Sequence, residues 1–120
     1  MDIIAVFVGS GLGAILRWLC QSRWNIENGL PLGTLLVNVA GGFAAGICLA
    51  IASRLTGDLR LFLVTGVLGG LTTFSAMTSE IVSMGLRGSW FSAAAYGVGG
   101  LVLGAFACWL GYFGASNVVL

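Results

Sequence analysis

Four apolar stretches, separated by short polar segments, divide this chain of 120 residues. None of them alternates apolar and polar residues as a strand would, and each is near the roughly 20 residues that a helix needs to cross a bilayer. Because 58% of the residues are hydrophobic and only 8% are charged, a water-soluble domain of this length could not hide its apolar surface. We therefore predict an all-α membrane protein, a single membrane domain with four transmembrane helices at about residues 3–22, 32–52, 59–84 and 90–113.

The third stretch contains the residues least suited to a straight membrane helix. Its roughly 26 residues would extend about 39 Å as an unbroken helix, which exceeds the hydrocarbon thickness. Gly69 and Gly70 are followed by Thr72, Thr73 and Ser75, so flexible and hydroxyl-bearing residues gather near the middle of the bilayer. Irregular backbone at that depth is tolerated only where it is buried in protein or lines a wet cavity. We therefore predict that the third helix is broken near its middle, around Gly69, where something polar is held or passes.

The arginines of the connecting turns give almost no signal for orientation. Arg54 and Arg60 lie on the side of the membrane that holds both termini, whereas Arg23 and Arg87 lie on the other side, where Arg17 would add a third. The positive-inside rule orients a chain by such differences, so a nearly even count leaves both orientations open. Four helices are also too few to enclose a polar path and shield it from lipid. We expect two oppositely inserted copies to pair as an antiparallel, dual-topology homodimer. A nucleic acid would find no basic patch to bind.

Five polar side chains within the predicted helices are candidates for function. Thr34 and Asn38 share one face of the second helix, where they either bond to a neighbouring helix or donate hydrogen bonds to a passing solute. Arg17 either extends toward the interface or supplies a positive charge at a pore mouth. Glu80, on the third helix, is either a functional carboxylate or a solvated one at an aqueous vestibule. Tyr96, near the start of the fourth helix, is by itself a typical interfacial anchor.

Small residues recur at helical spacing on three of the predicted helices. Such stripes let helices approach closely in lipid, so we interpret them as packing surfaces. They are Gly9 with Gly13, Gly42 with Gly46, and Gly97 with Gly100 and Gly104.

Three phrases of the sequence resemble the signatures of one family. They are GSGLGAILRW at residues 9–18, PLGTLLVN at residues 31–38, and GGLTTFS at residues 69–75, with Ser79 and Glu80 beyond it. With four predicted spans, these phrases make the chain similar to the CrcB/Fluc fluoride channels. The resemblance implies antiparallel dimers with two pores that export fluoride passively and relieve its toxicity. It also implies a multi-pass protein of the inner (plasma) membrane and favours a bacterial source.

The resemblance further implies roles for individual residues. Phe74 would be the first of two pore phenylalanines, and Asn38 the pore asparagine at the vestibule. The backbone carbonyls of Gly69 and Thr72, from both copies, would hold a structural sodium ion at the centre of the dimer. Met77 stands where the family has its second pore phenylalanine, so this chain departs from the pattern there. The other expected pore or vestibule residues are Thr34, Thr73, Ser75, Tyr96, Arg17 and Glu80.

Two other functions compete with fluoride conduction. A small multidrug-resistance type exporter has the same size and number of spans, but it keeps a titratable carboxylate in its first helix. Here the only such candidate, Glu80, lies on the third. A non-transporting assembly subunit explains the glycine stripes but not the hydroxyl-rich break. We do not expect an enzyme, because the sequence has no histidine, no metal-ligand cluster and no nucleophile–base pair.

Overall fold

The computed structural model describes residues 1–119, and these residues are helical almost throughout. Four helical segments are long and apolar enough to cross a membrane, which confirms the predicted all-α class with four spans. The third of these segments is assembled from shorter pieces. The elements are α1 (Asp2–Trp24), α2 (Leu32–Ala50), a short η1 (Ala52–Arg54), α3 (Gly57–Arg60), η2 (Leu61–Leu68), α4 (Gly69–Leu71), α5 (Phe74–Leu86) and α6 (Trp90–Val119).

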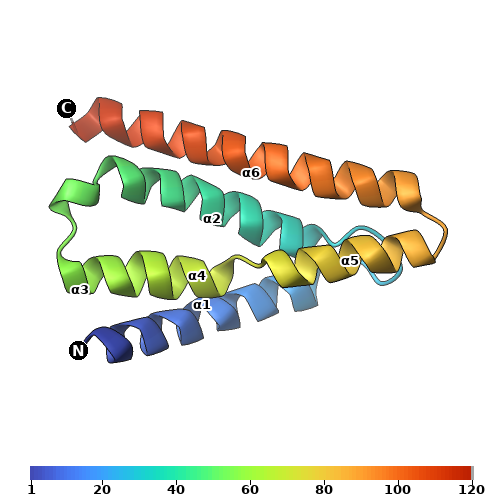
Figure 1. The fold of residues 1–120 in the computed structure, drawn as a ribbon, viewed down its shortest axis with the longest axis horizontal. Helices are drawn as coiled ribbons and strands as arrows, with labels where there is room; N and C mark the ends of the chain where they lie inside the picture. Colours follow the sequence, from blue (N-terminus) through green and yellow to red (C-terminus); the bar gives the residue numbers. More distant parts are fainter. Residues whose placement is uncertain (120) are drawn as a thin grey trace.

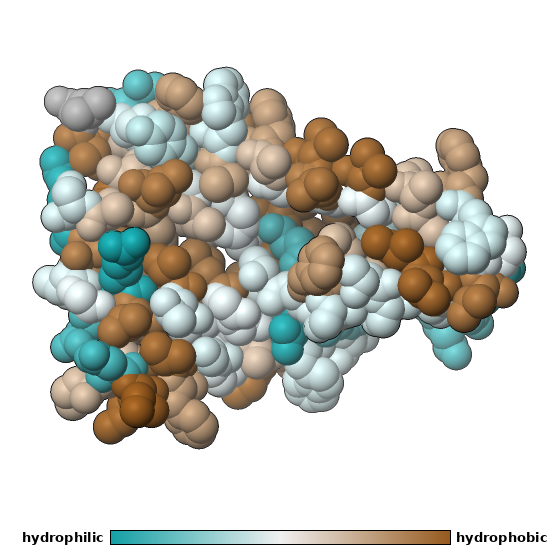
Figure 2. Space-filling view, viewed as in Figure 1, coloured by the Kyte–Doolittle hydropathy of each residue, from teal (hydrophilic) through white to brown (hydrophobic). Residues whose placement is uncertain are grey.

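The long helices follow one axis of the molecule (Figure 1). α6 lies along α2, and α1 lies against η2 and α4, the first half of the third segment. Both termini are at the same end, as four crossings require, and the α1–α2 and α5–α6 turns are at the other. Figure 2 shows a mostly apolar or weakly polar surface, with hydrophilic residues gathered toward the end that holds the termini. Large apolar side chains are exposed along every spanning segment, which suits contact with lipid.

Glycines bring the helix backbones into direct contact, as the stripes predict. A methyl group at Gly13 would overlap the carbonyl oxygen of Val67 on η2, and one at Gly46 would overlap the carbonyl of Cys108 on α6. Any larger residue would therefore push the helices apart. The packing interpretation is confirmed for these positions, and it explains how helices without a water-driven hydrophobic effect stay close.

The third segment is interrupted after α4, where Thr72 and Thr73 adopt extended backbone conformations. Thr72 has φ −81° and ψ 153°, and Thr73 has φ −149° and ψ 120°. The predicted interruption near the middle of the segment is present, and it falls on the two threonines, since Gly69 itself is helical with φ −63° and ψ −36°. Gly70 serves instead for contact with α1, since a methyl group there would overlap the Ser10 carbonyl. Threonine hydroxyls can bond to nearby backbone, which helps these residues leave the helix.

Candidate functional site

Asn38 on α2 holds the interrupted backbone of the third segment. Its Nδ2 donates to the Thr73 carbonyl at 3.1 Å, and the Thr73 N–H donates to its Oδ1 at 2.8 Å. Thr73 is only 8% exposed, so water cannot readily replace these bonds. Of the two sequence-based interpretations of Asn38, the structure contains the bond to a neighbouring helix. The Asn38 amide thus bonds to two backbone groups of Thr73 that would bond to other backbone groups in a continuous helix.

The diverted hydrogen bonds leave two carbonyls without their helical partners. In a continuous helix the N–H of Thr73 would bond to the carbonyl of Gly69, and the N–H of Ala76 to that of Thr72. Here the Thr73 N–H bonds to Asn38, and the Ala76 N–H bonds to Thr73 Oγ1 at 3.1 Å. The two carbonyls are those for which the family resemblance implies sodium binding. Such oxygens can replace part of the hydration shell of an alkali cation.

The start of α5 lies inside the molecule rather than at its end (Figure 1). The Thr73 side chain caps this helix. The first N–H groups of a helix have no partner within it and carry the positive end of the helix dipole. The break therefore sets freed carbonyls on one side and helix N–H groups on the other, within a few residues of each other.

A groove of about 550 Å³ opens beside the break, between α2, the third segment and α6. It brings together four of the predicted pore residues, Asn38, Thr73, Phe74 and Met77. The Phe74 side chain is 77% exposed. Met77 takes up the space beside Gly100, where an added methyl group would sit 3.5 Å from its sulfur. The residues that line the groove, which also include Gly69 and Thr72, carry no charge.

Glu80 on α5 forms a second polar cluster with side chains of α2 and α6. Its Oε1 accepts a hydrogen bond from Thr34 Oγ1 at 2.7 Å, and its Oε2 accepts one from the Tyr96 hydroxyl at 2.7 Å. Thr34 is fully buried and Tyr96 nearly so. Glu80 also lines a cavity of about 410 Å³, to which Arg87 contributes as well. The carboxylate is thus held by three helical segments while it faces a polar space.

Two amides at the end of α1 join this cluster, and the sequence analysis missed them. Asn25 Nδ2 lies 3.3 Å from Thr34 Oγ1 and 3.4 Å from Glu80 Oε1, and Gln21 Nε2 donates to Thr34 Oγ1 at 3.1 Å. Gln21 and Asn25 are one helical turn apart, which was the available signal. Amides at a helix end usually face water, so their spacing alone does not identify a buried cluster.

Residues 4–112 match the family model described as "CrcB-like protein, Camphor Resistance (CrcB)". The chain belongs to this CrcB-like family. The match confirms the resemblance that the three sequence phrases carry.

Relatives of this CrcB-like chain bear a more specific name. A protein of Burkholderia vietnamiensis named fluoride-specific ion channel FluC is 42% identical over 116 residues, 90% of this chain and 91% of that protein. A protein of Roseiflexus sp. with the same name is 42% identical over 120 residues, 88% of this chain and 94% of that protein. One from Serratia proteamaculans, also so named, is 47% identical over 85 residues, 68% of this chain and 67% of that protein.

Two predicted site residues of this CrcB-like chain lie apart from both clusters. Arg17 is half-buried on α1 and is not among the residues that line the groove or the cavity beside Glu80. Ser75 is exposed on α5, where its carbonyl accepts a hydrogen bond from Thr78 Oγ1 at 3.0 Å. Within residues 1–119 of one copy, Arg17 is not brought to the other predicted residues, and Ser75 lies beside Phe74 only as its neighbour in the chain.

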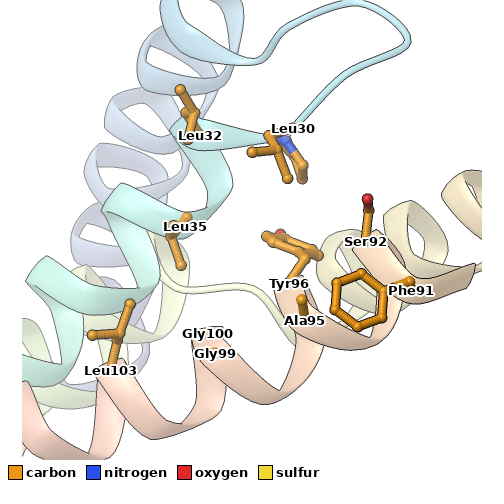
Figure 3. A pocket seen from close by; sticks show the side chains of 11 residues that line it. Leu30, Leu32, Leu35, Phe91, Ser92, Ala95, Tyr96, Gly99, Gly100 and Leu103 are labelled. Atoms are coloured by element: carbon orange, nitrogen blue, oxygen red, sulfur yellow. The ribbon is translucent and has the colours of Figure 1, made fainter. Parts of the chain in front are cut away.

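A third cavity, of about 330 Å³, lies between the start of α2 and the start of α6. In Figure 3, Leu35 from α2 and Phe91 and Tyr96 from α6 border this space, which is largely apolar. Tyr96 borders it while its hydroxyl bonds to Glu80. Tyr96 thus separates an apolar space from the polar cluster.

Proposed function

We propose that this chain is a fluoride channel, through which fluoride leaves the cell passively. Its relatives bear the name of fluoride-specific ion channels, and the family match covers most of the chain. The observation that carries the proposal is the break: α5 begins inside the molecule, and Phe74 at its start borders an uncharged groove.

The groove offers a small anion several weak attractions and no charge that would trap it. The N–H groups at the start of α5 favour negative charge. The edge of an aromatic ring is positive, so the Phe74 ring edge suits an anion as well. Asn38 Nδ2 has a second hydrogen, for which the Met77 sulfur at 4.0 Å is only a weak acceptor. Conduction requires binding weak enough for the ion to leave, and these groups satisfy that condition better than an arginine would.

Met77 takes the place of a second ring in this proposal. A flexible thioether can fill the space that a ring would occupy, but it cannot offer an aromatic edge. Phe74 is therefore the main aromatic contact for fluoride. Thr73 and Ser75 lie on either side of it and complete the proposed pore wall at the break.

The working unit in this proposal is an antiparallel homodimer with two pores. In one copy the groove is open along its side, and interrupted backbone cannot face lipid at that depth. A second copy would cover the groove and supply the missing wall. The nearly even arginine count on the two sides of the membrane permits the opposite insertion that such a pair needs.

A sodium ion at the dimer centre fits the chemistry of the break. The Gly69 and Thr72 carbonyls lose their helical partners to the Asn38 and Thr73 side chains. A two-fold axis near the break would bring four such oxygens together. The ion would neutralise the facing carbonyl dipoles and so fix the two third segments to each other.

The Glu80 cluster lies toward the end of the molecule and serves as a vestibule in this proposal. Thr34 and Tyr96 donate to the carboxylate there. Arg17 would act from outside this cluster, as a positive charge that attracts anions toward the pore mouth. Export follows from the membrane potential of an inner (plasma) membrane, worth about 2.3 kcal/mol per charge at 100 mV, so it needs no coupling ion.

Anion efflux from liposomes that hold the purified protein tests the function. Fluoride should leave rapidly and chloride should not. Chloride passing as readily as fluoride, or neither passing, would refute the assignment. Proton-dependent export of organic cations would favour the multidrug exporter, and no transport of any ion would favour the assembly subunit. The names of the relatives are those of ion channels, which accords with the prediction that the chain is not an enzyme.

A further inference from the structure

Asn25 connects the turn after α1 to the Glu80 cluster through both ends of its amide. Its Oδ1 accepts a hydrogen bond from the backbone N–H of Thr34 at 3.0 Å. A backbone N–H can only donate, so the atom that faces it must be the amide oxygen. The orientation of the amide is therefore determined, and the two hydrogens of Nδ2 are left for Thr34 Oγ1 at 3.3 Å and Glu80 Oε1 at 3.4 Å.

These donors determine the direction of the Thr34 hydroxyl. A hydroxyl has one hydrogen and two acceptor lone pairs. Gln21 Nε2 at 3.1 Å and Asn25 Nδ2 at 3.3 Å occupy the lone pairs. The hydrogen is left for Glu80 Oε1, 2.7 Å away. Thr34 is thus committed to donate to the carboxylate.

The surroundings of Glu80 hold its carboxyl group in one position. It accepts hydrogen bonds from Thr34, from Tyr96 and, at a longer distance, from Asn25. Tyr96 on α6 and Arg87 at the end of α5 are the ionisable side chains that contact Glu80 or line its cavity. α1 and α2 contribute only amides and a hydroxyl to the cluster.

We propose that Asn25 is a positioning residue for ion conduction, which acts through Thr34 and Glu80 and does not touch the ion. By directing the Thr34 hydroxyl at Glu80, it keeps the carboxylate in one place at the end of the ion path. Without Asn25, Thr34 would have a free lone pair, and its hydroxyl could turn away from Glu80. This inference rests on the channel function proposed above.

Asn25→Asp is the variant that tests the proposal most directly. It retains the oxygen that accepts from the Thr34 N–H, but it places a carboxylate oxygen where Nδ2 donated to Glu80. Two carboxylates at that separation do not both ionise readily, so the pair shares a proton that it loses only as the pH rises. We expect fluoride efflux from proteoliposomes to fall about tenfold between about pH 6 and about pH 9 in this variant, because the two like charges that then face each other push Glu80 out of its position. The efflux of the wild type should change little over the same range.

Two controls separate positioning from a general effect of charge or fold. Asn25→Asp combined with Glu80→Gln removes the carboxylate pair, so its pH profile should be flat again. Asn28→Asp adds the same charge to the same cavity, and its φ of 55° suits aspartate as well as asparagine. Asn28→Asp should also give a flat profile. Loss of efflux in Asn25→Asp that does not depend on pH, or pH dependence that persists in the double variant, would overturn the proposal.

Absence of fluoride efflux from the wild type would refute the channel function itself, whereas the outcomes above, measured against normal wild-type efflux, concern the role of Asn25 alone.

Discussion

Asn38→Leu removes the side chain that bonds to both the N–H and the carbonyl of Thr73. Leucine has a similar shape but neither donates nor accepts hydrogen bonds. The Thr73 N–H loses its 2.8 Å bond and the Thr73 carbonyl its 3.1 Å bond. Both groups lie in a residue that is nearly buried, so the substitution strands them away from water.

The cost follows from these two groups. A buried backbone group left without a partner costs about 1–3 kcal/mol, so Asn38→Leu should lower the free energy of unfolding by about 2–6 kcal/mol. The backbone can compensate if the Thr73 N–H bonds to the Gly69 carbonyl and the helix continues through the break. This rearrangement recovers some stability, but it occupies a proposed sodium ligand. Either way, fluoride efflux should fall, because the start of α5 moves.

The measurement compares unfolding of the purified protein in sodium and in a large organic cation, together with fluoride efflux. Binding to the folded state alone stabilises it, so the wild type should be more stable in sodium. The Asn38→Leu variant should be less stable, and the effect of sodium should be reduced. Asn117→Leu makes the same substitution at an exposed residue of α6 and should match the wild type. If the free energy of unfolding of Asn38→Leu lay within about 0.5 kcal/mol of the wild-type value and its efflux were normal, Asn38 would not hold the break.

Three further substitutions test other parts of the molecule. Gly46→Ala should destabilise the protein by about 1–3 kcal/mol, because the methyl group meets the α6 backbone. Gly11→Ala, in open space, should not, and thermal unfolding of both variants tests this difference. Tyr96→Phe removes one donor to the Glu80 carboxylate and should cost about 1.5–3 kcal/mol of unfolding free energy, and an unchanged value would mean that this bond is not made. Phe74→Leu keeps an apolar side chain without a ring edge, so fluoride efflux should fall at least about tenfold with little change in unfolding; equal efflux would exclude the ring from the path.

The break shows how far sequence reasoning reaches. The length of the third stretch and its glycines and threonines indicate that it is interrupted near its middle, but they do not determine which of these residues leave the helix. In the structure Gly69 is helical, and the extended residues are Thr72 and Thr73. The reason is Asn38, since its amide can bond to a peptide group only where α2 passes, and that position is a property of the packed helices.

For the polar residues, too, the sequence indicates one part of the site and the packing of the helices determines the other. Glu80, Thr34 and Tyr96 are recognisable in the sequence because polar groups in apolar helices need partners. Their meeting in one cluster, and the participation of Asn25, depend on how α1, α2, α5 and α6 are arranged.

The sequence by itself determined the class of molecule: four apolar spans, glycine faces for close packing, and polar residues that must find partners within the membrane. These follow from composition and spacing, because a bilayer allows a long apolar segment few alternatives to a helix. Only the tertiary structure decided which carbonyls are freed, which residue holds the break and which amide orients the Thr34 hydroxyl. Those outcomes depend on hydrogen bonds of about 3 Å between distant segments, and such contacts exist only after the helices have packed.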